Sequence, residues 1–533
     1  MPLNMDYDVL ILGSGPAGTG AALGLAGKGL RVGVVDVGNM PPTHNLDGNF
    51  YHIKQAPVPW RDNLIGPHLE YLCGIFGRYV MPKKRPPLFR FALQDDKAPL
   101  TPLHSETFQG DFSYAFGGLA NIWGGQLPRW DDTDLASFPF EASDLAPYYE
   151  RLESEIGISG ENDDLEQFYG SSSALQEPLP LMASGANLLS RYAKLRHHLN
   201  MRGVYIGRPR AGILTAPHGG RPAHDFHALE FFRPGIPSIY CPVQSMRKLI
   251  QNGDVEYVPS YFAERFFEDE GGVHLCIRSL QNDETTTLTA RALLLAAGTL
   301  GSARIVLASQ GGPGIRLPIA ENLLSYVPLV NPFLLGAAQE TKSIYMQLNL
   351  CYRPEGQRLV MGTFYGISGL LLSDFIADTP LSLPCAAQIL PKLTPAMLVL
   401  HLWHGAELDP AHNWLELNAD GSLHVTYKHR LDGSVERNII RQILKLGWLT
   451  LPNLVQYPLP GNSFHYAGAL AMREHPGPFE CSASGQLYGT KGIYVVDGAA
   501  LPSVSAKNLS LTIMANSMRV ADGLVRHLQR EKD

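Results

Sequence analysis

The sequence of 533 residues has few cysteines and little charge of either sign. Its six cysteines include no CxxC pair, which disfavours a zinc ribbon or a dithiol redox motif. The net charge is −7, and no basic block is long enough to follow a phosphate backbone. We therefore expect no nucleic-acid partner.

Long hydrophobic runs are also absent. The best run, residues 292–303, is shorter than the roughly 18 apolar residues that a membrane-spanning helix needs. The first residues lack the basic segment and the cleavage site of a secretory signal peptide. With 45% hydrophobic residues the composition is that of a globular chain, so we expect a cytoplasmic protein without a membrane partner.

A dinucleotide-binding pattern lies near the N-terminus. Residues 8–12 form an apolar run typical of a buried parallel strand, and the sequence GSGPAG follows at residues 13–18. Small and apolar residues continue at helical spacing to residue 28, and a second strand over 30–36 ends in an aspartate. This order of strand, glycine turn, helix, strand and acid predicts a Rossmann-type site.

Each residue of this pattern has a physical role. Gly13 permits the tight turn, Gly15 lets a pyrophosphate approach the backbone, and Gly18 lets the helix pack close to the strand. The N–H groups at the start of the helix, next to Pro16 and Ala17, face the phosphates. Asp36 can accept hydrogen bonds from ribose hydroxyls and suits NAD and FAD equally well.

A second glycine-rich segment, FGGLANIWGG, occupies residues 116–125. Its two glycine pairs allow close approach of the backbone to a planar ligand, although a pair of tight turns around a core tryptophan explains them equally well. Later in the chain, strands are predicted over 343–353, 359–367 and 396–405, followed by a hairpin over 414–428. This region predicts a mainly antiparallel domain inserted into an α/β chain.

The C-terminal part carries the most specific motifs. These are NSFHYAG at 462–468, the strand GIYVVDG at 492–498, and NLSLTIMA at 508–515, which begins a helix running to about residue 528. Together with the N-terminal pattern they resemble the glucose–methanol–choline (GMC) oxidoreductase family of flavoenzymes. The resemblance covers residues 8–38, 113–130, 291–310 and 462–525.

The resemblance implies an α/β fold with a Rossmann-type FAD-binding domain and an inserted, mainly antiparallel-sheet substrate domain. The FAD-binding domain would comprise residues 1–160, 251–320 and 456–533, and the substrate-binding domain residues 321–455. Residues 161–250 would form a mixed region that belongs partly to the substrate domain or to a lid.

The resemblance also implies FAD as the cofactor. Ile122 stands where pyranose oxidases attach the flavin through a histidine, so we expect FAD to be held non-covalently. The helix that starts near Asn508 would direct its positive end toward the flavin. Matched cofactor-binding positions, besides those of the N-terminal pattern, are Gly117, Gly118, Asn121, Ile122, Gly124, Asp497, Gly498, Asn508 and Leu509.

His465 and Asn508 fall on the family's active-site pair, in the His/Asn form found in the cholesterol oxidase and pyranose oxidase branches. An imidazole can accept a hydroxyl proton near neutral pH, and a carboxamide can donate to the developing alkoxide. We therefore predict oxidation of an alcohol to a carbonyl, with His465 as base, Asn508 as a positioning donor, and hydride transfer to flavin N5. Dioxygen or another acceptor would reoxidise the flavin.

The expected substrate is a sugar, a glycoside or an amino-sugar natural product. Asp374, Asp378, Glu407 and Asp409 could bind an aminated sugar, although solvated surface charge is the simpler interpretation. The alternatives are a sterol or other lipid alcohol, which predicts an apolar cavity wall from residues 343–405, a non-redox flavoprotein, and an NAD-dependent enzyme.

Two histidines, His401 and His404, lie in one of the predicted strands. In a strand, His401 and His404 would point to opposite faces, which disfavours a shared metal, and we expect no metal site. His401 and Trp403 would share a face that lines a cavity or simply packs a sheet, and we do not assign them to the site.

Overall fold

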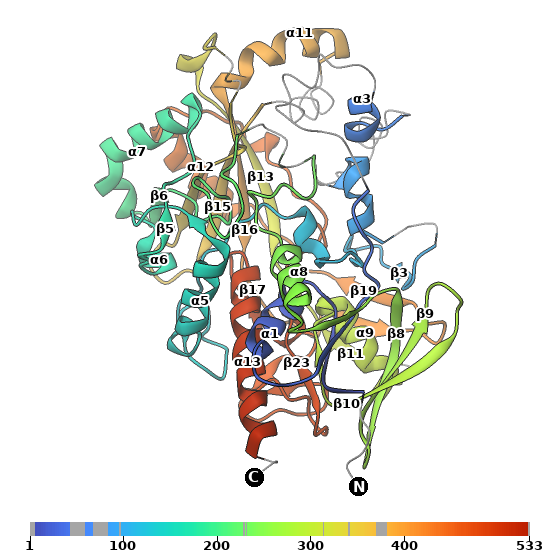
Figure 1. The fold of residues 1–533 in the computed structure, drawn as a ribbon. Helices are drawn as coiled ribbons and strands as arrows, with labels where there is room; N and C mark the ends of the chain where they lie inside the picture. The colour runs from blue at the N-terminus through green and yellow to red at the C-terminus, as the bar shows by residue number, and fades with distance from the viewer. Residues whose placement is uncertain are drawn as a thin grey trace.

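The computed structural model describes residues 6–42, 59–67, 84–94, 98–226, 230, 232–312, 314–338, 340, 342–368 and 381–530. The described elements form two tiers, with a parallel sheet and its helices in the lower half of Figure 1 and an antiparallel sheet in the upper half. Across these ranges, no helix is both long enough and apolar enough to cross a membrane.

The lower tier is built on the predicted N-terminal strands. The parallel strands lie in the order β7–β2–β1–β10–β23. Strand β10 also pairs antiparallel with β9, which in turn pairs antiparallel with β8. Strands β1 and β2 have almost no polar residues because helices and loops cover both faces of this sheet. The strands are β1 (Tyr7–Leu12), β2 (Val32–Val35), β7 (Glu256–Val258), β8 (Tyr261–Asp269), β9 (Gly272–Ser279), β10 (Thr285–Leu295) and β23 (Ile493–Val495).

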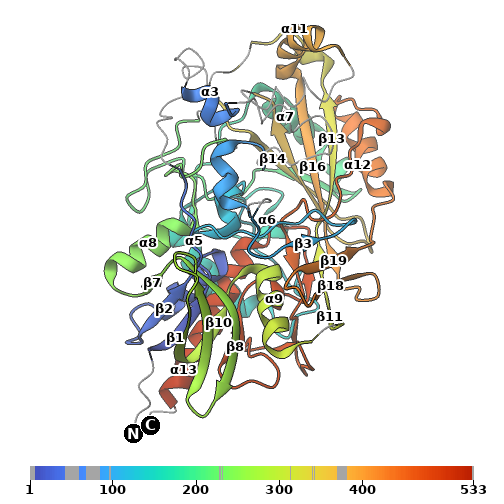
Figure 2. The same cartoon turned by 90° about the vertical axis from the view of Figure 1, so that its right-hand side faces the viewer.

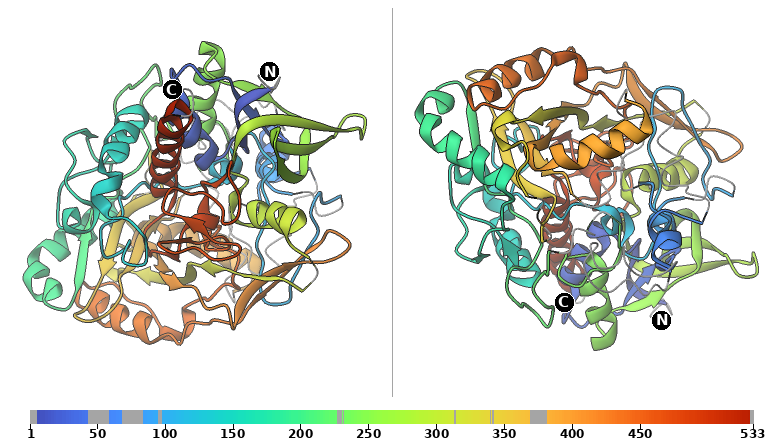
Figure 3. Two further views of the ribbon diagram at one scale, coloured as in Figure 1. Left: turned by 90° about the horizontal axis from the view of Figure 1, so that it is seen from below. Right: turned by 90° about the horizontal axis from the view of Figure 1, so that it is seen from above.

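Two helices from opposite ends of the sequence pack together in this tier. Helix α1 (Pro16–Leu25) follows the first glycine turn, and helix α13 (Ser510–Arg530) runs down the centre of the molecule, as Figure 3 shows from below. Their backbones approach closely because a Cβ at Gly20 would lie only 2.6 Å from the carbonyl oxygen of Met514. Helices α5 (Ala142–Ile156), α8 (Pro242–Asn252) and α9 (Gly298–Gln310) complete this tier.

The upper tier is an antiparallel sheet with the strand order β13–β16–β15–β14–β6 (Figure 2). Helices α7 (Ala183–Asn200) and α12 (Ser434–Lys445) contribute leucine, isoleucine and tyrosine side chains to the core of this tier. The predicted strands over 343–405 are present, and β6 joins them from the region between 161 and 250. The strands are β6 (Val204–Gly207), β13 (Leu323–Val330), β14 (Met346–Tyr352), β15 (Val360–Gly366) and β16 (Met397–His404).

Short strand pairs connect the two tiers. Strand β12 (Ala320–Glu321) pairs with β20 (Tyr466–Ala467), and β17 (Ala406–Glu407) pairs with β24 (Ser503–Val504). Each pair joins a segment next to an antiparallel-sheet strand to a C-terminal loop, with β20 just after His465 and β24 shortly before Asn508. The fold thus anchors both predicted catalytic residues beside the antiparallel sheet.

The remaining elements are short or peripheral. The predicted hairpin over 414–428 belongs to a four-stranded sheet of β11 (Arg316–Pro318), β18 (Asn413–Leu417), β19 (Leu423–Tyr427) and β3 (Leu103–His104). The others are α3 (Pro59–Leu64), α6 (Glu166–Tyr169), α11 (Leu383–Leu393), β4 (Ile158–Ser159), β5 (Leu175–Gln176), β21 (Met472–Arg473), β22 (Cys481–Ser482), and the 3-10 turns η2 (Pro87–Ala92), η3 (Gly118–Ile122), η4 (Pro332–Leu334), η5 (Thr394–Ala396), η6 (Pro452–Leu454) and η7 (Gly498–Ala500).

Candidate active site

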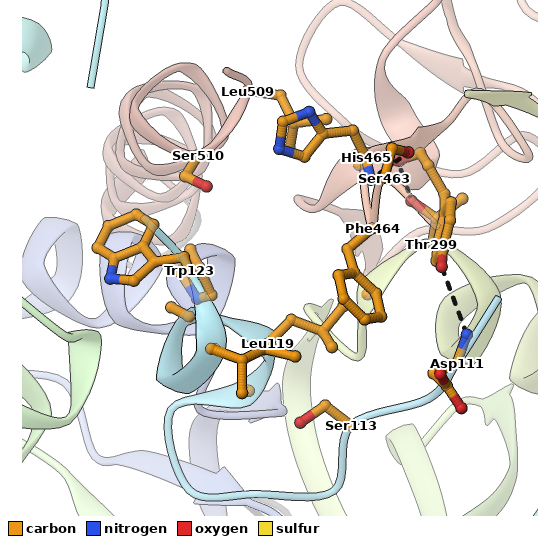
Figure 4. Close-up of a pocket in the computed structure, with 18 of the residues that line it drawn as sticks. Asp111, Ser113, Leu119, Trp123, Thr299, Ser463, Phe464, His465, Leu509 and Ser510 are labelled. Carbon is orange, nitrogen blue, oxygen red and sulfur yellow. Dashed lines mark hydrogen bonds between the residues drawn. The ribbon is translucent and has the colours of Figure 1, made fainter. Parts of the chain in front are cut away.

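A cavity of about 600 Å³ is bounded by residues of both tiers. Its walls come from the two glycine-rich segments, from the first residues of α9 and α13, and from strands β13, β15 and β16. Figure 4 shows His465, Phe464, Leu119, Trp123 and Ser510 around the open space. The volume lies in the range of sites that enclose small molecules and cofactors.

Most of the predicted site residues line this cavity. The lining residues among them are Gly13, Gly15, Pro16, Ala17, Asp36, Gly118, Ile122, Gly124, His465, Asp497, Gly498, Asn508 and Leu509. Segments that are up to about 500 residues apart in the sequence therefore meet around one space, as the resemblance implied. Gly18, Gly117 and Asn121 lie behind the wall.

These three residues support the wall from behind. A Cβ at Gly18 would lie 1.9 Å from the carbonyl oxygen of Gly13, so only glycine lets α1 pack against the turn. Asn121 Nδ2 donates to the carbonyl oxygens of Phe116 (3.0 Å) and Gly118 (2.8 Å) and so closes the second glycine loop. Gly117 has a φ of 92°, in the left-handed region that favours glycine.

The nucleotide end of the cavity fits a dinucleotide. The first turn of α1 starts at Gly15, where no side chain caps the helix, so backbone N–H groups are available to an anion. A Cβ at Gly15 would meet only the Cα of Gly118, at 3.9 Å, and would project into otherwise open space. Helices α9 and α13 also begin at the cavity, which adds two further positive helix ends.

Asp36 lies at the end of β2 and is buried. Its Oδ2 accepts hydrogen bonds from the hydroxyls of Ser14 and Tyr257, the latter at 3.4 Å. The hydroxyl oxygen of Ser14 in turn accepts from the N–H of Gly117 at 2.9 Å, which joins the two glycine segments. Burial raises the pKa of Asp36 to about 7, because a carboxylate loses hydration there.

Asp497 is fixed by the protein itself. Its carboxylate accepts from the N–H of Ala499 (2.9 Å) and from the hydroxyl of Ser302 (2.5 Å), and burial raises its pKa to about 6. A Cβ at the adjacent Gly498 would lie 2.6 Å from both Thr299 Oγ1 and the carbonyl oxygen of Tyr466. Only glycine therefore fits where this turn meets the cavity.

His465 lies at the end of a loop that a buried carboxylate organises. Glu321 accepts hydrogen bonds from the backbone N–H of Gly461 and from the hydroxyl of Ser463, the latter at 2.9 Å. The Ser463 hydroxyl oxygen accepts from the N–H of His465 at 3.0 Å. The intervening Phe464 has a φ of 59°, and this left-handed backbone turns its ring into the cavity (Figure 4). Burial raises the pKa of Glu321 to about 7.

The His465 imidazole has one bonded nitrogen and one face that packs on an aromatic ring. Its Nδ1 lies 2.9 Å from Asn322 Oδ1, and its ring stacks on Trp403 with ring centres 4.6 Å apart. The protein around the ring lowers the pKa of His465 to about 3 because it removes water from the charged form. The imidazole is therefore neutral at physiological pH.

Asn508 enters the cavity from a tightly anchored segment. The Trp130 indole donates to the Asn508 carbonyl oxygen at 3.2 Å. The side chain of Lys507 is fully buried, with its Nζ 3.0 Å from Asp131 Oδ2 and in contact with Asp134. The side-chain oxygen of Asn508 is buried and has no hydrogen-bond partner among the described residues, as expected for an atom that binds a ligand.

Sequence reasoning left out the aromatic wall of strand β16. His401 and Trp403 line the cavity with their ring centres 4.2 Å apart, and the Tyr326 ring of β13 stacks on His401 at 4.3 Å. His401 Nε2 and Trp403 Nε1 are buried without a partner among the described residues. His404 points to the other face, as predicted, and its Nε2 lies 3.1 Å from Glu436 Oε1.

Glu407 and Asp409, two of the acidic residues that could bind an aminated substrate, do not line the cavity. Glu407 pairs with Arg358 at 3.1 Å and Asp409 with His412 at 2.9 Å, all on exposed side chains. Asp374 and Asp378 lie outside the described residues. Within the part of the chain that the structure describes, no group of three His, Cys, Asp or Glu side chains is arranged to hold a metal ion.

Known proteins resemble this chain in its C-terminal segment and in its overall fold. The model of the C-terminal domain of the GMC oxidoreductases matches residues 453–517, the segment that contains His465 and Asn508. Among solved structures, pyridoxine 4-oxidase from Mesorbium loti has a TM-score of 0.57 at 14% identity, with 98% of this chain and 99% of that chain covered. A formate oxidase variant from Aspergillus oryzae, solved in a study of FAD modification, has a TM-score of 0.59 at 12% identity, with the same coverage.

Curated relatives match over a short stretch only. Soluble pyridine nucleotide transhydrogenases from Citrobacter koseri and Salmonella typhimurium are 44% identical over 57 residues. The match spans 11% of this chain and 11% of the length of each relative.

The predicted fold class is confirmed, and the match of the C-terminal segment agrees with the predicted family. The C-terminal segment, residues 453–517, matches the model of the GMC oxidoreductases, and the fold of the chain is that of solved oxidases over almost its whole length. FAD is the cofactor of this family, and the cavity that the predicted residues line is suited to it.

Proposed function

We propose that this protein oxidises the hydroxyl group of an apolar or aromatic alcohol to a carbonyl. Bound FAD would supply the hydride acceptor for this reaction. The observation that carries the proposal is that a neutral imidazole and an unpartnered carboxamide oxygen line the same cavity as an uncapped, glycine-rich dinucleotide turn.

In this proposal His465 removes the hydroxyl proton. Burial keeps the imidazole uncharged before the substrate arrives, so a ring nitrogen is available to accept that proton. The Asn508 Nδ2–H group donates a hydrogen bond to the substrate oxygen as its proton leaves. The stacked rings of Trp403 and His401 exclude water from this side of the cavity and support the imidazole plane.

The walls of the cavity favour an apolar substrate over a sugar. No Asp, Glu, Lys or Arg stands among the lining residues between 326 and 456, in the part that the structure describes. The lining residues there are mostly aromatic or aliphatic, namely Tyr326, Pro328, Tyr365, Gly366, Ile367, Leu390, Met397, Val399, His401, Trp403, Leu454 and Gln456. An apolar wall from residues 343–405 is the feature that the lipid-alcohol alternative predicted.

The few polar atoms on this wall indicate how such a substrate would be oriented. His401 Nε2 and Trp403 Nε1 are buried and unpartnered among the described residues, so one or two polar groups of the substrate would meet them. A polyol would bury several hydroxyl groups against carbon and lose their hydration. We therefore propose a planar or largely hydrocarbon alcohol with one or two further polar groups.

An anaerobic screen tests the proposal. The holoenzyme is mixed without oxygen with aryl alcohols, sterols, long-chain alcohols, sugars and amino sugars, and the flavin absorbance is followed. We expect an aryl or lipid alcohol to bleach the flavin. The Trp403→Leu substitution should slow flavin reduction by that alcohol. Reduction by sugars or amino sugars alone would refute the apolar assignment, and no reduction by any alcohol would favour a non-redox role. Readmission of air then shows whether oxygen is the acceptor.

A further inference from the structure

Asn322 holds the imidazole of His465 from behind the cavity wall. It lies between strands β12 and β13, has no exposed surface, and does not line the cavity. Its Oδ1 is 2.9 Å from His465 Nδ1. Asn322 therefore reaches the candidate base on the side away from the substrate.

The orientation of the Asn322 amide is determined by its other two hydrogen bonds. Its Nδ2 donates to the carbonyl oxygen of His404 at 2.9 Å and to that of Ser505 at 2.7 Å. Turning the amide over would place Oδ1 against both carbonyl oxygens and remove both bonds. Because the group is fully buried, no water is available to replace them. The amide oxygen must therefore face His465.

This orientation determines the tautomer of a neutral imidazole. An amide oxygen only accepts hydrogen bonds, so the hydrogen between the two groups belongs to His465 Nδ1. A neutral imidazole that carries its hydrogen on Nδ1 has a free lone pair on Nε2. We propose that Asn322 is a positioning residue that sets His465 in the Nδ1–H tautomer, the form whose Nε2 can accept the substrate proton.

The same amide connects the segments that form the catalytic pair. The His404 carbonyl follows Trp403 on strand β16, and Ser505 lies three residues before Asn508. One buried side chain thus bonds to the base, to the strand that stacks on the base, and to the loop that presents the second residue of the pair. The inference rests on the proposed role of His465 as the base.

Because its surroundings keep His465 neutral, the tautomer of the ring decides whether Nε2 can act as the base. Burial holds its pKa well below the ordinary value without help from a neighbouring charge, so the imidazole is neutral over the physiological range. His401, a titratable ring on the far side of Trp403, is itself kept neutral by burial. With both rings neutral, the position of one hydrogen decides whether Nε2 is a base.

The experiment compares Asn322→Leu and Asn322→Asp with the matched control Asn331→Leu. Asn331 is also fully buried and hydrogen-bonded, and it follows strand β13 where Asn322 precedes it, but it contacts Asn187 rather than His465. The holoenzymes are labelled with ¹⁵N-histidine, and the His465 signals are identified by their loss in His465→Gln. Thermal unfolding of each variant is measured in parallel.

We expect wild type and Asn331→Leu to show a protonated Nδ1 and an unprotonated Nε2. Asn322→Leu should lose this fixed pattern and slow anaerobic flavin reduction by about 10- to 100-fold, the size of effect known for hydrogen-bond partners of metal-bound histidines. Asn322→Asp should keep the Nδ1–H form and raise the pKa of His465, because a carboxylate favours the protonated ring. The acid limb of its pH–rate profile should then move to higher pH.

An unchanged His465 tautomer in a folded Asn322→Leu variant would overturn the inference. If that variant does not fold, an Asn322→Asp enzyme whose His465 titrates as in wild type would overturn it instead. The spectra do not depend on turnover, so a fixed tautomer in an enzyme that oxidises no alcohol would refute the proposed function alone. Conversely, if the enzyme oxidises an alcohol but the His465 tautomer does not change when Asn322 is replaced, this inference is refuted and the proposed function is not.

Discussion

Replacement of Gly15 by alanine should weaken FAD binding without lowering the stability of the apoprotein. Gly15 has ordinary extended backbone angles, and an added Cβ would touch only the Cα of Gly118 at 3.9 Å. The methyl group would project into the cavity, where the first N–H groups of α1 face an anion. Displacing a pyrophosphate from one or two charge-assisted N–H bonds costs about 3 kcal/mol, or roughly 100-fold in Kd.

The Kd is measured by calorimetric titration of FAD into the apoprotein. The stability of the apoprotein is measured separately, by thermal unfolding without FAD. Gly312→Ala is the matched control, since that glycine is exposed with open space around it. Gly13→Ala is the opposite control, because its φ of 103° and a Cβ only 2.6 Å from the Ala296 carbonyl oxygen should impair folding itself. An apo Gly15→Ala protein that melts like wild type but binds FAD within threefold of wild type would refute the reasoning.

Two further predictions concern the catalytic loop and its pH dependence. Lys507→Met should lower the free energy of unfolding by about 3–5 kcal/mol, because it leaves the carboxylates of Asp131 and Asp134 without their buried partner. Chemical denaturation measures this change, and a loss below about 1 kcal/mol would contradict the prediction. Because the pKa of His465 is lowered from 6.5 to about 3, the imidazole stays neutral as the pH falls through 6.5, so the rate of flavin reduction should stay level down to about pH 5. A fall in the flavin-reduction rate with a midpoint near pH 6.5, absent in His465→Gln, would show that the base is not buried as described.

The sequence allowed the nucleotide side of the site to be predicted because its signals are local. A strand, a glycine turn and a helix within 20 residues carry their own geometry, and the structure places Gly13 and Gly15 on the cavity wall. The meeting of His465 and Asn508 followed from the resemblance, since their 43-residue spacing alone does not place them together. The antiparallel strands over 343–405 were predicted from short strand-like runs, which are also a local signal.

The substrate side could not be predicted in the same way. Alternation showed that His401 and Trp403 share one face of a strand, but not whether that face meets a cavity or a helix. That choice depends on the packing of β16 between β13 and β15, which comes from distant segments. Asn322 carries no motif, and its role follows only from three hydrogen bonds to residues between 82 and 183 positions away.

The account depends most directly on the transfer of a hydroxyl proton to His465. The measurement is the rate of anaerobic flavin reduction by the best alcohol from the screen, in wild type and in His465→Gln, with FAD content matched by absorbance. We expect the glutamine variant to retain its flavin and to be reduced at least about 100-fold more slowly, in line with the loss of a general base. Reduction within a fewfold of the wild-type rate would contradict the assignment of His465 as the base.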